Sequence, residues 1–106
     1  MATLHLRGYS PGVYRLTATQ RKRVEQFVDE NRARDPIYIV NGYSSSSSNH
    51  ELNFALSTER ANEVSRLMIS LAVPNDKIAQ RSFGERLFSG NDELGQLTMS
   101  VVVECP

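Results

Sequence analysis

Apolar residues recur along the chain at two spacings, which predict helices and strands. Helical spacing occurs in two segments, near residues 17–31 and 57–72. Strand-like patterns occur in four others: 3–7, 37–42, 77–83 and 96–104. The predicted order is strand, helix, strand, helix, strand, strand. This order favours the α+β class, as a two-layer sandwich of βαβαββ order with both helices on one face of a four-stranded mixed sheet.

Local signals predict where the helices begin and end. Thr17, with Gln20 three residues later, makes a capping box at the start of the first helix. We expect Ser57 to be the N-cap of the second helix, which must end before Pro74. Residues 10–12, Ser-Pro-Gly, predict a type II turn between the first strand and the first helix.

The apolar stripes predict a single core. We expect seven side chains to be buried in it: Val24, Phe27, Ile39, Val64, Leu67, Leu71 and Val101. The segment 37–42 is almost continuously apolar, which is typical of a strand covered by helices. The chain has 106 residues, enough for one core and too few for two, so we expect a single domain over residues 1–106.

The composition is that of an ordinary soluble globular protein, with 40% apolar and 23% charged residues. Twelve basic residues balance twelve acidic ones, which argues against binding to nucleic acid or to an anionic membrane. The apolar runs are too short to span a bilayer, so we expect any membrane tether to lie outside this chain. The first residues show no signal peptide, which fits a cytosolic protein or a domain cut from a longer exported chain.

Few residues suggest catalysis or metal binding. Cys105 is the only cysteine, which excludes an internal disulfide and a cysteine-based metal cluster, and we expect it to be an incidental thiol. His5 and His50 are far apart in the sequence, and no pattern pairs them on a metal. No nucleophile elbow or phosphate loop occurs. The sequence therefore predicts a protein that is not an enzyme and needs no cofactor.

Four basic residues lie around the start of the predicted first helix: Arg15, Arg21, Lys22 and Arg23. Contact with an acidic polymer or an acidic partner protein is one interpretation. No aromatic side chains interleave with them as nucleic-acid binding would favour. A solvated helix face is the interpretation that the pattern favours.

Arg60 stands out in the predicted second helix. It lies four residues before Val64 and extends the apolar stripe, so we expect it to point toward the end of the strand 37–42. With Ser57 as N-cap, Arg60 would lie in the first turn, where its charge opposes the helix dipole. An inward arginine beside free N–H groups makes a small carboxylate or phosphate site. A structural arginine paired with a nearby glutamate or carbonyl fits the residues equally well.

One long segment resembles a known family. Residues 41–85 read NGYSSSSSNHELNFALSTERANEVSRLMISLAVPNDKIAQRSFGE and resemble the C-terminal domain of the OmpA/MotB/Pal family, which holds cell-envelope proteins to peptidoglycan. These positions match the family pattern without a gap: Gly42, Tyr43, Asn53, Leu56, Ser57, Arg60, Ala61, Val64, Leu67, Val73, Ile78, Gly84 and Glu85. The resemblance covers nearly the whole chain. It implies a periplasmic domain, associated with the outer membrane, that forms the C-terminal part of a longer exported envelope protein.

The resemblance also implies a ligand site. In this family an aspartate and an arginine together bind the meso-diaminopimelate side chain of the peptidoglycan stem peptide. The arginine corresponds to Arg60, whereas the aspartate falls on Ser45 and the preceding threonine on Ser44. The implied binding residues are Arg60, Asn53, Ser45, Ser44 and Leu56. The five serines at 44–48 are then a ligand loop rather than a flexible linker.

Two departures from the family pattern leave two functions open. Ser45 offers the ligand's ammonium a neutral bond worth about 1 kcal/mol, where a charged one is worth about 1.5–3 kcal/mol, so we expect binding to weaken roughly tenfold or more. Glu51 is the nearest loop carboxylate that could compensate. The family's paired arginines before the last strand match residues 98–100, Thr-Met-Ser. The alternative is a scaffold that contacts protein in an envelope-spanning secretion or motility complex, without binding peptidoglycan.

Overall fold

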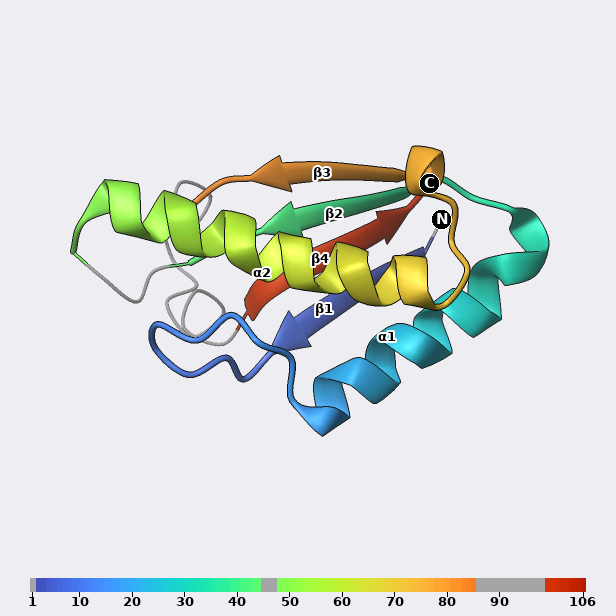
Figure 1. Cartoon of the computed structure of the whole chain (residues 1–106), viewed down its shortest axis with the longest axis horizontal. Helices are drawn as coiled ribbons and strands as arrows, with labels where there is room; N and C mark the ends of the chain where they lie inside the picture. The colour runs from blue at the N-terminus through green and yellow to red at the C-terminus, as the bar shows by residue number, and fades with distance from the viewer. Residues whose placement is uncertain (1, 45–47, 86–98) are drawn as a thin grey trace.

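The computed structural model describes residues 2–44, 48–85 and 99–106 (Figure 1). The elements are β1 (Ala2–Arg7), α1 (Ala18–Asn31), η1 (Arg32–Arg34), β2 (Tyr38–Gly42), α2 (His50–Ser70), η2 (Asn75–Lys77), β3 (Ile78–Ser82) and β4 (Met99–Cys105). The two main helices and four strands follow the predicted βαβαββ order. The first residues of the predicted strand 96–104 fall within residues 86–98, which lie outside the described residues.

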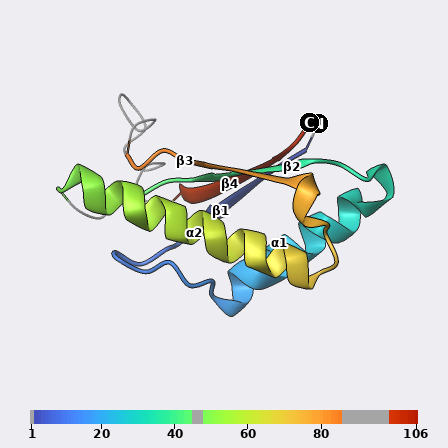
Figure 2. The ribbon, with the colours of Figure 1, turned by 45° about the horizontal axis from the view of Figure 1, so that its top comes forward.

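The four strands form one mixed sheet in the order β1-β4-β2-β3. β4 runs antiparallel to both β1 and β2, and β2 runs parallel to β3. Both main helices lie on the same face of this sheet, as Figures 1 and 2 show from two directions. The predicted two-layer α+β architecture is therefore confirmed.

The core lies between the sheet and the two helices. Five predicted core residues are buried there: Val24, Phe27, Val64, Leu67 and Val101. Ile39 and Leu71 are only half-buried. Side chains alternate along a strand, so Ile39 points away from the helices while its neighbours Tyr38 and Val40 are buried. Ile37, expected in this strand, precedes β2 and is 53% exposed. The helices cover only one face of β2. The nearly continuous apolar run in this segment therefore does not mean that both faces of the strand are buried.

The segment before α1 and the start of α1 follow the sequence prediction. The Thr17 hydroxyl accepts a hydrogen bond from the Gln20 amide (3.2 Å), and the Gln20 side chain accepts one from the Thr17 amide (2.9 Å). This is the capping box. Upstream, the Val13 amide donates to the Ser10 carbonyl (3.1 Å), and Gly12 has φ +73°. These two features fit the type II turn predicted for residues 10–12.

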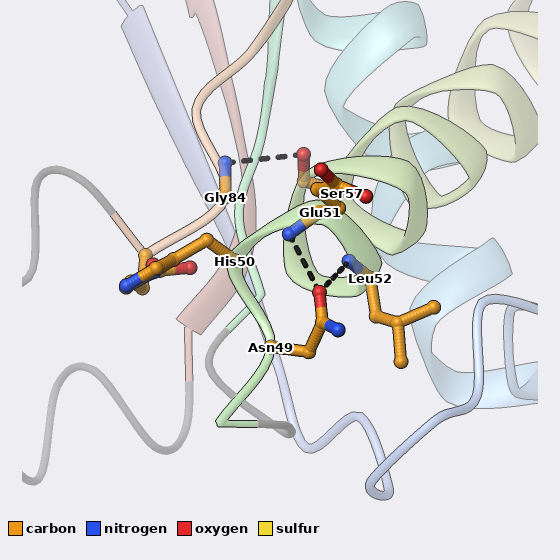
Figure 3. Close-up of polar contacts among 7 residues, drawn as sticks. Asn49, His50, Glu51, Leu52, Ser57 and Gly84 are labelled. Carbon is orange, nitrogen blue, oxygen red and sulfur yellow. Dashed lines mark hydrogen bonds and ion pairs between the residues drawn. The ribbon is translucent and has the colours of Figure 1, made fainter.

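α2 begins earlier than predicted. Its N-cap is Asn49 rather than Ser57, and the Asn49 side-chain oxygen accepts bonds from the amides of Glu51 (2.9 Å) and Leu52 (3.1 Å) (Figure 3). Ser57 lies inside the helix. Its hydroxyl donates to the Phe54 carbonyl (2.7 Å) and cannot cap a helix that has already begun. The first turns of α2 extend beyond the ends of β2 and β3 (Figure 1).

A glycine lets α2 pack directly on β2. A Cβ atom at Gly42 would lie 2.0 Å from the Ser57 carbonyl oxygen and 3.1 Å from the Ala61 Cβ. No side chain fits in that space. This close approach places the middle of α2, including Arg60, over the end of β2.

Candidate functional site

Arg60 occupies the interior of α2, on the side that faces the end of the sheet. We expected it in the first turn, beside free backbone N–H groups. That expectation is wrong because α2 begins at His50, about three turns earlier, so the backbone around Arg60 is inside the helix. The predicted inward direction is correct, since Arg60 is only 3% exposed.

Among the described residues, the Arg60 guanidinium donates four hydrogen bonds, all to uncharged oxygens. Nε–H donates to the Val13 carbonyl (2.7 Å), and Nη2 donates to the Ser10 carbonyl (3.1 Å). Nη1 donates to the Tyr43 carbonyl and to the Ser100 hydroxyl, both at 3.3 Å. Arg60 thus joins the segment after β1 to the end of β2 and the start of β4.

The positive charge of Arg60 is stabilised by the dipoles of its hydrogen-bond acceptors and by an aromatic ring. The guanidinium carbon lies 4.7 Å from the centroid of the Tyr9 ring, whose face attracts a cation. Burial lowers the pKa of Arg60, and the nearby Tyr9 partly offsets that shift. The guanidinium remains charged at neutral pH. Within residues 2–44, 48–85 and 99–106, no carboxylate forms an ion pair with Arg60. It is a buried cation, and in that part of the chain only neutral groups hold it.

The structure describes three of the other four residues of the predicted site. Ser44 is buried at the end of β2, where its amide donates to the Gly84 carbonyl (3.0 Å). Asn53 is buried on α2, and Leu56 is half-buried. Seven residues separate Asn53 from Arg60, so they share one helix face about 10 Å apart along the axis. Ser45 lies outside the described residues.

Glu51 lines a different hollow of the molecule. A cavity of about 500 Å³ lies between the first turns of α2 and the end of β3, lined by His50, Glu51, Phe54, Phe83, Gly84 and Glu85. The His50 Nδ1 atom contacts the Glu85 carboxylate at its rim. In the parts of the chain that the structure describes, no three His, Cys, Asp or Glu side chains form a metal-binding group.

The sequence left a carbonyl open as a partner of Arg60, but it did not indicate which carbonyls. Three of its contacts come from the turn segment: the Ser10 carbonyl, the Val13 carbonyl and the Tyr9 ring. A signal was present, because apolar Tyr9 and Val13 flank a Pro-Gly turn that would otherwise be polar. However, every residue has a backbone carbonyl, so the sequence does not show which carbonyls will bind Arg60.

Comparison with known proteins places the chain in a family. A sequence profile of the OmpA family matches residues 9–95. This chain belongs to the OmpA family. The match includes Ser44, Ser45, Asn53, Leu56 and Arg60, which are all the residues of the predicted site. Compared with curated proteins, the sequence has no significant match.

Solved structures share the fold of this OmpA-family chain. The OmpA-like domain of FopA1 from Francisella tularensis matches with a TM-score of 0.78 and 20% identity, over 97% of this chain and 72% of that one. The C-terminal domain of Helicobacter pylori MotB matches with a TM-score of 0.79 and 11% identity, over 94% and 81%. The peptidoglycan-associated lipoprotein of Burkholderia pseudomallei matches with a TM-score of 0.72 and 17% identity, over 94% and 85%. At these identities the likeness shows a common fold. Among the described residues of the chain, no helix is both long and apolar enough to cross a membrane.

Proposed function

We propose that this OmpA-family chain is a non-enzymatic cell-envelope domain that binds the peptidoglycan stem peptide weakly. The proposal includes a periplasmic location, as part of a longer exported protein tethered at the outer membrane. Family membership over residues 9–95 supports it. So does the shared fold with a solved protein described as a peptidoglycan-associated lipoprotein.

The observation that carries the proposal is the chemistry of Arg60. This buried guanidinium bonds only neutral oxygens in the described structure, at the position where the family binds a carboxylate. A bond between a charged donor and a charged acceptor is stronger than one to a neutral carbonyl. A diaminopimelate carboxylate would therefore stabilise Arg60 better than its present partners. Asn53, Leu56 and Ser44 would form the surroundings of that contact.

With Ser45 in place of the family's aspartate, only one end of the ligand meets a charged partner. Arg60 can hold the ligand's carboxylate, but Ser45 offers the ligand's ammonium only a neutral oxygen. Discrimination between ligands depends on groups that would be left unpaired in the wrong complex. We therefore expect weak binding and poor selection of diaminopimelate over other amino acids.

The second candidate function is a scaffold that contacts other proteins of an envelope-spanning secretion or motility complex. The specific observation in its favour is the burial of Arg60, which is 3% exposed and bonded to three backbone carbonyls and a hydroxyl. An arginine used in this way stabilises the fold without any ligand.

Binding to purified peptidoglycan sacculi, followed by calorimetry with a stem-peptide fragment, separates the two functions. Ser45→Asp should tighten binding by about 1–2 kcal/mol, or roughly five- to thirtyfold, because it restores the charged partner of the ammonium. Ser48→Asp is the matched control, since it adds the same charge to the same run of serines, three residues from Ser45. Glu51→Gln tests compensation by that carboxylate.

Three results would decide against parts of the proposal. Equal gains from Ser45→Asp and Ser48→Asp would show a general charge effect instead of a restored site. Tight wild-type binding that Glu51→Gln abolishes would move the ammonium partner to Glu51. No retention on sacculi by either the wild type or Ser45→Asp would favour the scaffold.

A further inference from the structure

Residues 9–13, here called the strap, cover the Arg60 guanidinium between β1 and α1. Ser10 and Val13 supply carbonyl oxygens, and Tyr9 supplies a ring face. Tyr9 is buried, whereas the strap residues that follow it are exposed to solvent. The inner side of the strap therefore covers Arg60, and its outer side faces solvent.

The strap occupies one particular edge of the guanidinium. Nε–H and one N–H of Nη2 form a two-donor edge that can bind both oxygens of a carboxylate side by side. Here the Val13 carbonyl takes the Nε–H (2.7 Å) and the Ser10 carbonyl takes Nη2 (3.1 Å). Nη1 is held by the sheet, through Tyr43 and Ser100. The two strap carbonyls thus stand where the two oxygens of a bound carboxylate would stand.

We propose that the strap is an autoinhibitory element, which a ligand carboxylate must displace in order to reach Arg60. This inference rests on the proposed function of Arg60 as the carboxylate-binding residue. In the closed state the strap competes with the ligand for the same two donors. Apparent affinity is then the intrinsic affinity multiplied by the fraction of molecules whose strap is open.

Two glycines let the strap adopt its closed conformation without strain. Gly8 precedes the strap with φ +81°, and Gly12 lies within it with φ +73°. A Cβ at either position would meet no atom within 4 Å, so neither glycine is required by packing. Each serves the left-handed backbone of the closed strap, which other residues adopt only with strain. An alanine at Gly12 should therefore weaken the closed strap without removing a single side-chain contact.

The test compares the Ser45→Asp variant with the double variant Ser45→Asp, Gly12→Ala. Both carry Ser45→Asp so that binding is measurable. Exchange of the Arg60 Nε proton, followed by NMR, reports strap opening without any ligand. Calorimetry with a stem-peptide fragment reports affinity. Gly12→Ala should speed this exchange about five- to thirtyfold and tighten binding by the same factor. Gly8→Ala should act in the same direction.

Val73→Ala is the control for general destabilisation, because Val73 is buried at the far end of α2 from the strap. Equal acceleration of Arg60 exchange by Val73→Ala would overturn the strap as a separate moving element. Faster exchange in Gly12→Ala with unchanged affinity would overturn the gating role and leave the binding function standing. Faster exchange with no binding by either form would overturn the binding function, and the strap would then have nothing to gate.

Discussion

Tyr9 brings a polar group into the core beneath Arg60. Its hydroxyl is the one buried side-chain oxygen or nitrogen that has no hydrogen-bond partner in the described part of the chain. A buried, unsatisfied hydroxyl costs about 1–3 kcal/mol. Tyr9→Phe keeps the ring against Arg60 and removes that cost, so the free energy of unfolding should rise by about 1 kcal/mol. Urea denaturation measures this change, and a loss of stability would show that the hydroxyl has a partner such as an ordered water.

The tyrosines also predict how stability depends on pH. Burial raises the pKa of Tyr9, Tyr38 and Tyr43. Below about pH 10 these groups hold their protons in both the folded and the unfolded chain, so they do not change stability with pH. Above it the unfolded chain releases protons that the folded chain keeps, and the free energy of unfolding falls. Denaturation curves from pH 8 to pH 11.5 should show this fall, with a smaller slope for Tyr9→Phe.

Among the elements, the contact between α2 and β2 depends on Gly42. Gly42→Ala would force a methyl group against the Ser57 carbonyl, so the helix must move away from the sheet. We expect the free energy of unfolding to fall by about 2–3 kcal/mol. Adding Ala61→Gly to this variant removes the contact with the Ala61 Cβ but leaves the closer contact with the Ser57 carbonyl. The free energy of unfolding should therefore stay low. Recovery in the double variant would mean that the side chain at position 61, and not the carbonyl, sets the helix distance.

The first turns of α2 depend on Asn49. Asn49→Ala removes the oxygen that accepts the Glu51 and Leu52 amides, which should cost about 1 kcal/mol. Hydrogen exchange at those two amides should accelerate, while amides near Arg60 stay protected. Asn49→Asp is the control, because a carboxylate keeps the cap and suits the positive end of the helix. Unchanged exchange in Asn49→Ala would show that this helix end does not rely on its cap.

Over the whole molecule, the spacing of apolar residues was sufficient to predict the layers. Helical and strand periods are properties of the sequence itself, and burial of Val24, Phe27 and Val64 follows from them. The start of α2 was missed because several polar residues before it could serve as caps. Local sequence does not decide between Asn49 and Ser57, whereas the path of the chain into the helix does.

The candidate site was predictable only in part. The inward direction of Arg60 follows from its place ahead of Val64 in the stripe. Its partners do not, because Ser10 and Val13 contribute backbone carbonyls. Where a carbonyl lies depends on the folded path of a segment some fifty residues away, which no side-chain pattern encodes. The strap could therefore be recognised only in three dimensions.

The two ends of the described chain lie side by side, since Ala2 pairs with Cys105 across the antiparallel strands β1 and β4 (Figures 1 and 2). Force applied between them would open these strands like a zipper, breaking hydrogen bonds one after another. Strands pulled from opposite ends would instead share the load and resist together. An optical-trap experiment with handles at positions 2 and 105 should therefore record yielding at low force. The rupture would start at the pair Ala2–Cys105 and reach the other end of the two strands, where Ser100 binds Arg60, last.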